Sequence, residues 1–364
     1  MKKMIIYLSI VLVGLILIII AILMLISPGK PERITDKNGN HIKNSISEKI
    51  FVEINGINQG MFIRGADSSN PLILFVHGGP AFPEYFLFDK FKVNLEDKFT
   101  VCYWEQRGGG LSYNSDIKPE SISFEQLKSD LVEVTKYLLK RFNKTKLVLM
   151  AHSGGTTFGI QAAISNPELF YAYIGIAQIT NQTESEKLAF NYMLEEYKRL
   201  NNHKKTEELK SFTISESVSE TKRFYKSLTR DESMHELGIG TMRNMNSVFN
   251  DVFLAVWRCR AYTLTEKLNY WRSKFFFIRK TSLIDELFKN DISKKYKKFE
   301  IPIIMISGKY DYTVNYSLSQ NYFTKIDAPL KKFYLFDNSA HSPIFEEPEK
   351  FSKIIFDEIA GFIK

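Results

Sequence analysis

MAHSGGT, residues 150–156, places a serine between small residues directly after the apolar run KLVLM (146–150). A strand, a small-x-Ser-x-small turn and then a helix are typical of a nucleophile elbow, in which the serine backbone is strained. Ala151 and Gly155 supply the small residues on either side of Ser153. Taken by itself, the pattern also fits a strand-to-helix turn in which the serine caps the helix.

Short apolar runs with helical periodicity between them flank this turn. The runs are residues 71–76, 99–104, 146–151, 172–177, 301–307 and 331–336. Helical spacing is clearest from Phe124 to Phe142, from Phe158 to Ile164 and from Pro348 to Ile363. This alternation predicts an α/β fold, with a mostly parallel sheet and helices on both faces. Asn55-Gly56, between two β-rich stretches, predicts a hairpin with a type I′ turn at the start of the folded part.

Residues 182–298 interrupt the alternation, because they are helical in pattern and rich in aromatic residues, with no convincing strand. We therefore predict a helical lid at 182–298, inserted between two parts of the α/β core at 49–181 and 299–364. Trp257, Trp271 and the run 275–277 fit either an apolar substrate pocket or the internal core of the lid.

The N-terminus carries an uncharged apolar run of 23 residues, 4–26. As a helix it spans about 35 Å, against a hydrocarbon core of about 30 Å. Because no small-x-small cleavage site follows, we predict an uncleaved single-pass anchor within residues 1–28, in contact with the lipid bilayer. A long cleaved signal peptide is the alternative. Residues 29–48 are polar and predict a linker, and the short basic N-terminus favours an extracytoplasmic position for the large domain.

Composition excludes several classes of function. The net charge is +8, but the lysines are scattered and no nucleic-acid motif is present, so we expect no nucleic-acid partner. Cys102 and Cys259 are far apart and form neither a disulfide framework nor a metal-ligand pattern. We expect no metal and no organic cofactor.

Three further stretches point to the same chemistry as the elbow. His77-Gly78-Gly79-Pro80 follows the first apolar run, so the N–H groups of Gly79 and Gly154 are predicted to form an oxyanion hole. Asp311 and His341 each follow a late predicted strand, and the chain order Ser153, Asp311, His341 fits a catalytic triad.

Other titratable residues fit the triad less well. Asp337, four residues before His341, is the rival acid, and we interpret it as a turn residue. His152 adjoins Ser153 but is predicted to point away from it, because successive strand residues alternate between faces.

These motifs resemble the α/β-hydrolase superfamily and, within it, the prolyl iminopeptidase-like branch. That branch carries His-Gly-Gly-Pro-Gly, Asp-Gln-Arg-Gly and Gly-x-Ser-x-Gly motifs, which here read HGGPA (77–81), EQRGGG (105–110) and AHSGG (151–155). The resemblance covers about residues 49–180 and 299–364. Ala81 and Glu105 are mild departures. No lid carboxylate matches a family motif for the substrate ammonium, so aminopeptidase activity is only implied.

The sequence thus predicts a membrane-anchored serine hydrolase that cleaves an ester or amide bond through an acyl-enzyme, with a small molecule or peptide as substrate. Gln106 and Arg107, on the loop after the second buried strand, are predicted to support the site, with substrate contact as the alternative. The other hypothesis is a catalytically silent, membrane-tethered binding module on a hydrolase scaffold.

Overall fold

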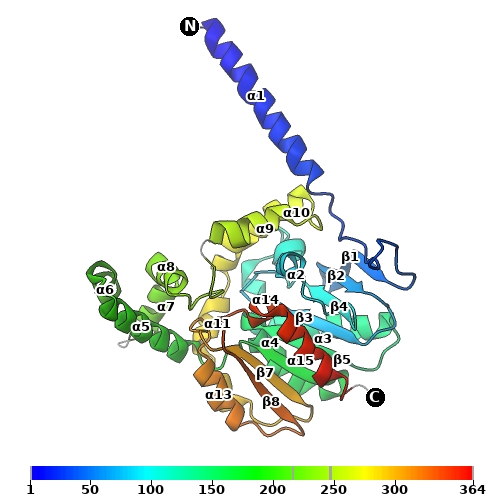
Figure 1. The fold of residues 1–364 in the computed structure, drawn as a ribbon, viewed down its shortest axis with the longest axis vertical. Coiled ribbons are helices and arrows are strands. Elements are labelled where there is room, and N and C mark those ends of the chain that lie inside the picture. The colour runs from blue at the N-terminus through cyan, green and yellow to red at the C-terminus, as the bar shows by residue number, and fades with distance from the viewer. Residues whose placement is uncertain (1, 215–216, 246–247, 363–364) are drawn as a thin grey trace.

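The computed structural model describes residues 2–214, 217–245 and 248–362. Its centre is an eight-stranded sheet in the order β1-β2-β4-β3-β5-β6-β7-β8 (Figure 1). β1 pairs with β2, and β2 with β4, in antiparallel fashion, and every other neighbouring pair is parallel. The strands are Ile46–Ile54 (β1), Ile57–Gly65 (β2), Leu72–Val76 (β3), Thr100–Trp104 (β4), Leu147–His152 (β5), Phe170–Ile176 (β6), Ile303–Gly308 (β7) and Lys331–Phe336 (β8).

The predicted mostly parallel sheet is therefore confirmed, and the six apolar runs correspond to β3–β8 with ends displaced by no more than two residues. The predicted hairpin is also confirmed. Ile54 pairs with Ile57 across the turn, and Asn55 and Gly56 have φ values of 47° and 75°, as a type I′ turn requires.

Helices cover both faces of the sheet, and β3 shows why its sequence is continuously apolar. Leu74 and Val76 pack in the core shared with α3 (Phe124–Arg141), α4 (Thr156–Ser165) and α13 (Tyr316–Thr324). Ile73 and Phe75 point to the other face, which holds α2 (Tyr85–Phe91), α14 (Pro343–Glu346) and α15 (Pro348–Ile359). A strand buried on both faces has no need for alternating polar residues.

Between β6 and β7 the described residues form helical turns and no strand. α5–α8 gather beside the sheet (Figure 1) around a small apolar core of their own, which includes Phe190, Tyr197 and Phe224. The later turns include two short π-helices, η5 and η6. The elements are α5 (Gln182–Arg199), α6 (His203–Lys210), α7 (Val218–Tyr225), α8 (Leu228–Glu236), η5 (Phe249–Phe253), α9 (Leu254–Arg258), α10 (Leu264–Arg272), η6 (Ser273–Phe277), η7 (Ile278–Lys280), α11 (Leu283–Lys289) and α12 (Ile292–Lys295).

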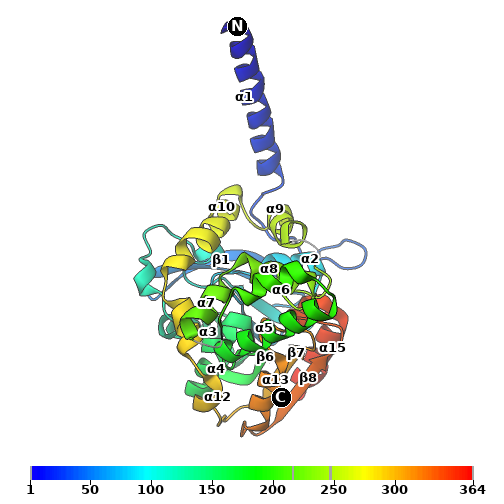
Figure 2. The same cartoon turned by 90° about the vertical axis from the view of Figure 1, so that its left-hand side faces the viewer.

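The N-terminal helix α1 (Lys2–Leu25) projects from the rest of the molecule (Figures 1 and 2), and its apolar side chains are exposed. Its length and composition suit a membrane span and equally a signal sequence. The chain that follows is held against the body. Ser27 is buried, and Pro28 forms an isolated β-bridge with Thr263.

Candidate active site

Ser153 occupies a sharp turn between β5 and α4. Its φ of 49° lies in the left-handed region, which costs free energy for a residue with a side chain. Gly155 shows why the turn needs small residues, because a Cβ there would lie 2.5 Å from the carbonyl oxygen of His77. The strained turn lifts Ser153 out of the sheet at the carboxyl ends of the parallel strands.

The residues predicted as a triad come together at this edge. His341 Nε2 lies 2.8 Å from Ser153 Oγ, and His341 Nδ1 lies 2.9 Å from Asp311 Oδ2. Asp311 is fully buried, and its Oδ1 accepts a hydrogen bond of 2.8 Å from the N–H of Val314. The rival acid, Asp337, is exposed and instead lies 3.5 Å from Lys309 Nζ.

The glycine-rich loop after β3 packs directly on the turn that carries Ser153. A Cβ on Gly154 would lie 2.2 Å from the carbonyl oxygen of Gly79 and 3.2 Å from its nitrogen. Gly79 has a φ of 112°, and within the described chain its N–H donates no hydrogen bond. The N–H of Gly154 lies in the first turn before α4, where helix geometry leaves N–H groups without an internal partner.

Gln106 contacts the loop after β3 and Arg107 contacts α3, and no hydrogen bond joins either of them to Ser153 within the described residues. The N–H of Gln106 donates to His77 Nε2 at 3.0 Å, and its side-chain amide donates to the carbonyl oxygen of His77. Burial lowers the pKa of His77 to about 4, so the ring is neutral and accepts this bond. Arg107 forms a buried two-point ion pair with Asp130, at 2.6 and 2.9 Å.

A buried pair of residues that no sequence motif indicates lies beside the predicted triad. His152 Nδ1 lies 2.8 Å from Glu84 Oε1, and His152 Nε2 lies 3.0 Å from the carbonyl oxygen of His341. Burial opposes protonation of His152, but Glu84, the carbonyl group of His341 and Asp311 together raise its pKa. Both ring nitrogens face acceptors, so a doubly protonated ring satisfies both contacts. Glu84 Oε2 also lies 3.4 Å from the backbone nitrogen of Gly78. The Glu84–His152 pair therefore connects the glycine-rich loop to the loop that carries His341.

This pair gives a pH-dependent prediction. Replacing Glu84 with Gln removes the charge that favours the His152 imidazolium, and we expect the free energy of unfolding to fall by about 2 kcal/mol at pH 6. Because the pKa of folded His152 is raised, the stabilisation is present below the unfolded value and is lost as the pH rises through the folded value. Urea titrations at pH 6 and pH 9 check this.

The expected result is a deficit for Glu84→Gln that shrinks at the higher pH. The exposed Glu120 supplies the matched control, since Glu120→Gln is expected to change neither value. An equal deficit at both pH values would show that the pair is not charged.

Two more carboxylates, the half-buried Glu346 and the buried Glu105, connect the segment between β6 and β7 to the loops of the site. Glu346 accepts hydrogen bonds from the N–H groups of Ala340 and Ser342, on either side of His341, and from that of Arg243. Burial raises the pKa of Glu346 to about 7. Glu105 likewise accepts from Leu111 N–H and from the Tyr262 hydroxyl, and burial raises its pKa to about 8.

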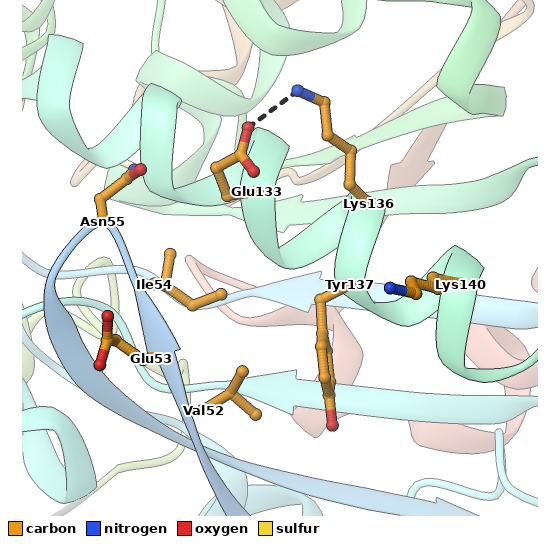
Figure 3. A pocket seen from close by; sticks show the side chains of 8 residues that line it. All are labelled: Val52, Glu53, Ile54, Asn55, Glu133, Lys136, Tyr137 and Lys140. Atoms are coloured by element: carbon orange, nitrogen blue, oxygen red, sulfur yellow. Dashed lines mark hydrogen bonds and ion pairs between the residues drawn. The ribbon is translucent and has the colours of Figure 1, made fainter.

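A hollow of about 240 Å³ lies elsewhere, between β1 and α3 (Figure 3). Tyr137 and Lys140 on α3 face the end of β1 there, and Glu133 pairs with Lys136 at 2.8 Å on the same helix. None of the predicted site residues lines this hollow, so it is separate from the edge that carries Ser153.

Comparison with known proteins agrees with this architecture. The model of the alpha/beta hydrolase fold family matches residues 71–348. The chain belongs to the α/β-hydrolase family. This α/β-hydrolase is 32% identical over 321 residues to the probable aminopeptidase YbaC of Bacillus subtilis, an alignment that covers 86% of the chain and 96% of that protein.

One sequence relative supports the resemblance drawn from the motifs, and one solved structure shares the fold. A proline iminopeptidase of Saccharolobus solfataricus is 22% identical over 315 residues, which cover 85% of this α/β-hydrolase and 91% of that protein. The crystal structure of a proline iminopeptidase-related protein from Thermus thermophilus has a TM-score of 0.60 at 14% identity, with 87% and 99% of the two chains covered. The predicted similarity to the prolyl iminopeptidase-like branch is thus confirmed.

Proposed function

We propose that this α/β-hydrolase is a serine hydrolase with Ser153 as nucleophile, His341 as general base and Asp311 as the acid that orients the histidine. The observation that supports the proposal is the continuous set of contacts from Ser153 Oγ through the His341 ring to the buried Asp311 carboxylate. The strained turn at Ser153 favours the same assignment, because strain of this kind is retained where function needs it.

The proposed mechanism follows from the protonation states of these groups. A neutral serine is a weak nucleophile, so His341 Nε2 removes its proton as Oγ attacks the substrate carbonyl. Asp311 keeps the proton of His341 on Nδ1 and stabilises the imidazolium that forms. His341 then protonates the leaving group. In the second half, it activates the water that hydrolyses the Ser153 acyl-enzyme.

The N–H groups of Gly79 and Gly154 are proposed to bind the oxyanion, and Gly154→Ala tests this. The new methyl group would meet the Gly79 carbonyl at 2.2 Å and force the two loops apart. Because loss of one oxyanion donor costs about 10²–10³ in rate, we expect kcat to fall by at least about 100-fold. Initial rates of Gly154→Ala and of the unaltered chain on the best substrate measure this fall in kcat.

Gly361→Ala is the control, since a Cβ there meets its nearest neighbour at an ordinary 3.4 Å. Full activity in Gly154→Ala would mean that this N–H and its spacing from Gly79 have no part in the reaction.

As reaction class we propose removal of an N-terminal residue from a peptide, because two relatives carry aminopeptidase or iminopeptidase names. Ester hydrolysis is the second candidate, and one contact favours it. Glu186, a buried carboxylate on α5, is held by Arg230 through two bonds of 2.8 and 2.6 Å. Gln182 joins Glu186 to the Asp311 loop, because its side-chain amide donates to Glu186 Oε1 and to the carbonyl oxygen of Thr313. A substrate ammonium that used Glu186 would have to compete with the Arg230 guanidinium.

A panel of three substrate types separates the candidates. Prolyl and alanyl amides with a free amine test the aminopeptidase, their N-acetylated forms are matched controls, and p-nitrophenyl esters test the esterase. Turnover of the free-amine amides with rejection of the acetylated ones supports the first candidate. Ester turnover without amide turnover supports the second. No turnover and no fluorophosphonate labelling would favour the binding module.

We also propose that α1 anchors the hydrolase in a membrane, with the residues after it outside the cytoplasm. The exposed apolar surface of α1 supports this. Carbonate extraction of membranes and protease protection test it. A chain that is extracted as a soluble protein, or that lacks residues 1–28 in its mature form, would establish the cleaved signal peptide instead.

A further inference from the structure

The end of α1 is attached to one side of the molecule rather than to a free linker. Lys267 on α10 donates hydrogen bonds to the carbonyl oxygen of Ile26 and to Ser27 Oγ, at 3.3 and 2.9 Å. The N–H of Gly29 donates to the carbonyl oxygen of Arg260 at 3.1 Å. Figures 1 and 2 show α1 leaving the body next to α9 and α10.

Beside this attachment lies a set of rings in contact with one another, here called the aromatic surface. Phe253 is its centre, with ring centroids 5.1 Å from Phe249, 6.0 Å from Trp257 and 5.2 Å from Trp271, and Phe275 stacks on Trp271 at 5.6 Å. Phe249 and Phe275 are 57% and 44% exposed, which is unusual for phenylalanine. The side chain of Phe276, in the run for which a substrate pocket and the core of the lid are the alternatives, lies outside the described part of the structure.

The aromatic surface is continuous with the last turn of α1. Leu23 and Ile26 line the same apolar hollow of about 400 Å³ as Phe253 and Trp257. Three residues can span at most about 11 Å. Because Pro28 forms a β-bridge with Thr263, the chain from Leu25 to Pro28 keeps the end of α1 close to the start of α10. A bilayer that contains α1 would therefore end near these rings.

The charges around the surface favour anionic headgroups. Asp251 and Glu266 are the acidic residues of segment 248–280, and each is paired with a lysine, Lys90 and Lys49 respectively. Arg258 and Arg260 are exposed, and within the part of the chain that is described neither forms an ion pair. Exposed arginines near a membrane surface are attracted by anionic lipids.

We propose that the aromatic surface lies in the headgroup region of the same bilayer that α1 enters. The proposal rests on the membrane anchor put forward above. Aromatic residues are enriched at this depth. Within the described residues the indole Nε1 atoms of Trp257 and Trp271 are buried without a hydrogen-bond partner, so the rings that this surface presents most openly are those of Phe249 and Phe275. The partner is a lipid surface, and α9, α10 and η6 would then face it.

Tryptophan quenching in the full-length chain tests the proposal. The chain has three tryptophans, and Trp104 is 1% exposed in the core of the sheet, so Trp257 and Trp271 are the two that would meet lipid. The protein is reconstituted into vesicles of phosphatidylcholine and phosphatidylglycerol, with or without bromine atoms near the glycerol backbone. A variant with Trp257→Phe and Trp271→Phe retains the apolar rings and serves as the matched control.

We expect brominated lipid to quench at least about a third of the emission of the unaltered chain, and almost none in the control variant. If no quenching is seen, vesicle flotation distinguishes a chain that is bound to the membrane from one that is not. A chain that floats without quenching overturns the proposal and leaves the anchor intact, and the surface would then be covered by protein, such as a second copy. A chain that does not float overturns both the anchor and the proposal.

Discussion

Ser153→Ala is expected to lower kcat by at least about 10⁴-fold on whichever substrate the wild-type enzyme turns over. The loss follows because no other group in the proposed mechanism can form the acyl-enzyme, and residual catalysis comes only from binding and the oxyanion donors. The stability is expected to change little or to rise, since alanine leaves the packing of the turn intact. Rate measurements with urea titrations distinguish loss of chemistry from loss of fold.

Ser352 provides the matched serine for this experiment. It is buried on α15, and within the described residues its Oγ has no hydrogen-bond partner. Ser352→Ala should therefore keep full activity. Retention of more than a few per cent of the rate in Ser153→Ala would remove this residue from the mechanism.

Asp311→Asn has the second large expected effect, a fall in kcat of about 10⁴-fold. The amide preserves the shape of the carboxylate, but its NH₂ group can face His341 Nδ1 and leave the ring with its proton on the wrong nitrogen. The variant also lacks the charge that stabilises the imidazolium. The contact at risk is the 2.9 Å one between His341 Nδ1 and Asp311 Oδ2.

The rival acid supplies the control for this second variant. Asp337 is exposed and lies 3.5 Å from Lys309 Nζ, so Asp337→Asn is expected to leave kcat unchanged. If Asp337→Asn were the damaging variant and Asp311→Asn the harmless one, the acid of the triad would have to be reassigned.

The fold was largely predictable because its signals are local. Strands buried on both faces need continuous apolar runs, and β3–β8 follow those runs closely. The elbow was predictable for the same reason, since steric crowding at Gly155 demands a small residue two positions after Ser153. The edge where Asp311 and His341 would lie also followed, because parallel strands end at one side of a sheet.

The contacts that surround the proposed triad could not be predicted, because they join residues far apart in the chain. Glu84 precedes α2, a helix too short to give a clear periodic pattern. It contacts His152, from which it is separated by 68 positions in the sequence. Strand alternation predicts that His152 points away from Ser153, and no hydrogen bond joins the two within the described chain. What the pattern could not reveal is that the ring reaches the carbonyl oxygen of His341.

The attachment of α1 to the rest of the molecule could not be predicted from the sequence, for a different reason. Neither Ser27 nor Lys267 belongs to a sequence motif, and a polar stretch after an apolar helix is most simply interpreted as a linker. In the structure, the Lys267 ammonium lies at the helix end, where carbonyl groups without internal partners favour a cation. Only the packing of α10 brings them together.

Mass-spectrometric mapping of a fluorophosphonate adduct on the folded full-length chain tests the proposed triad directly. Because the reagent requires a serine activated by a nearby imidazole, we expect one adduct, on Ser153, and its loss in His341→Ala. An adduct on another residue, or equal labelling of Ser153 without His341, would contradict it.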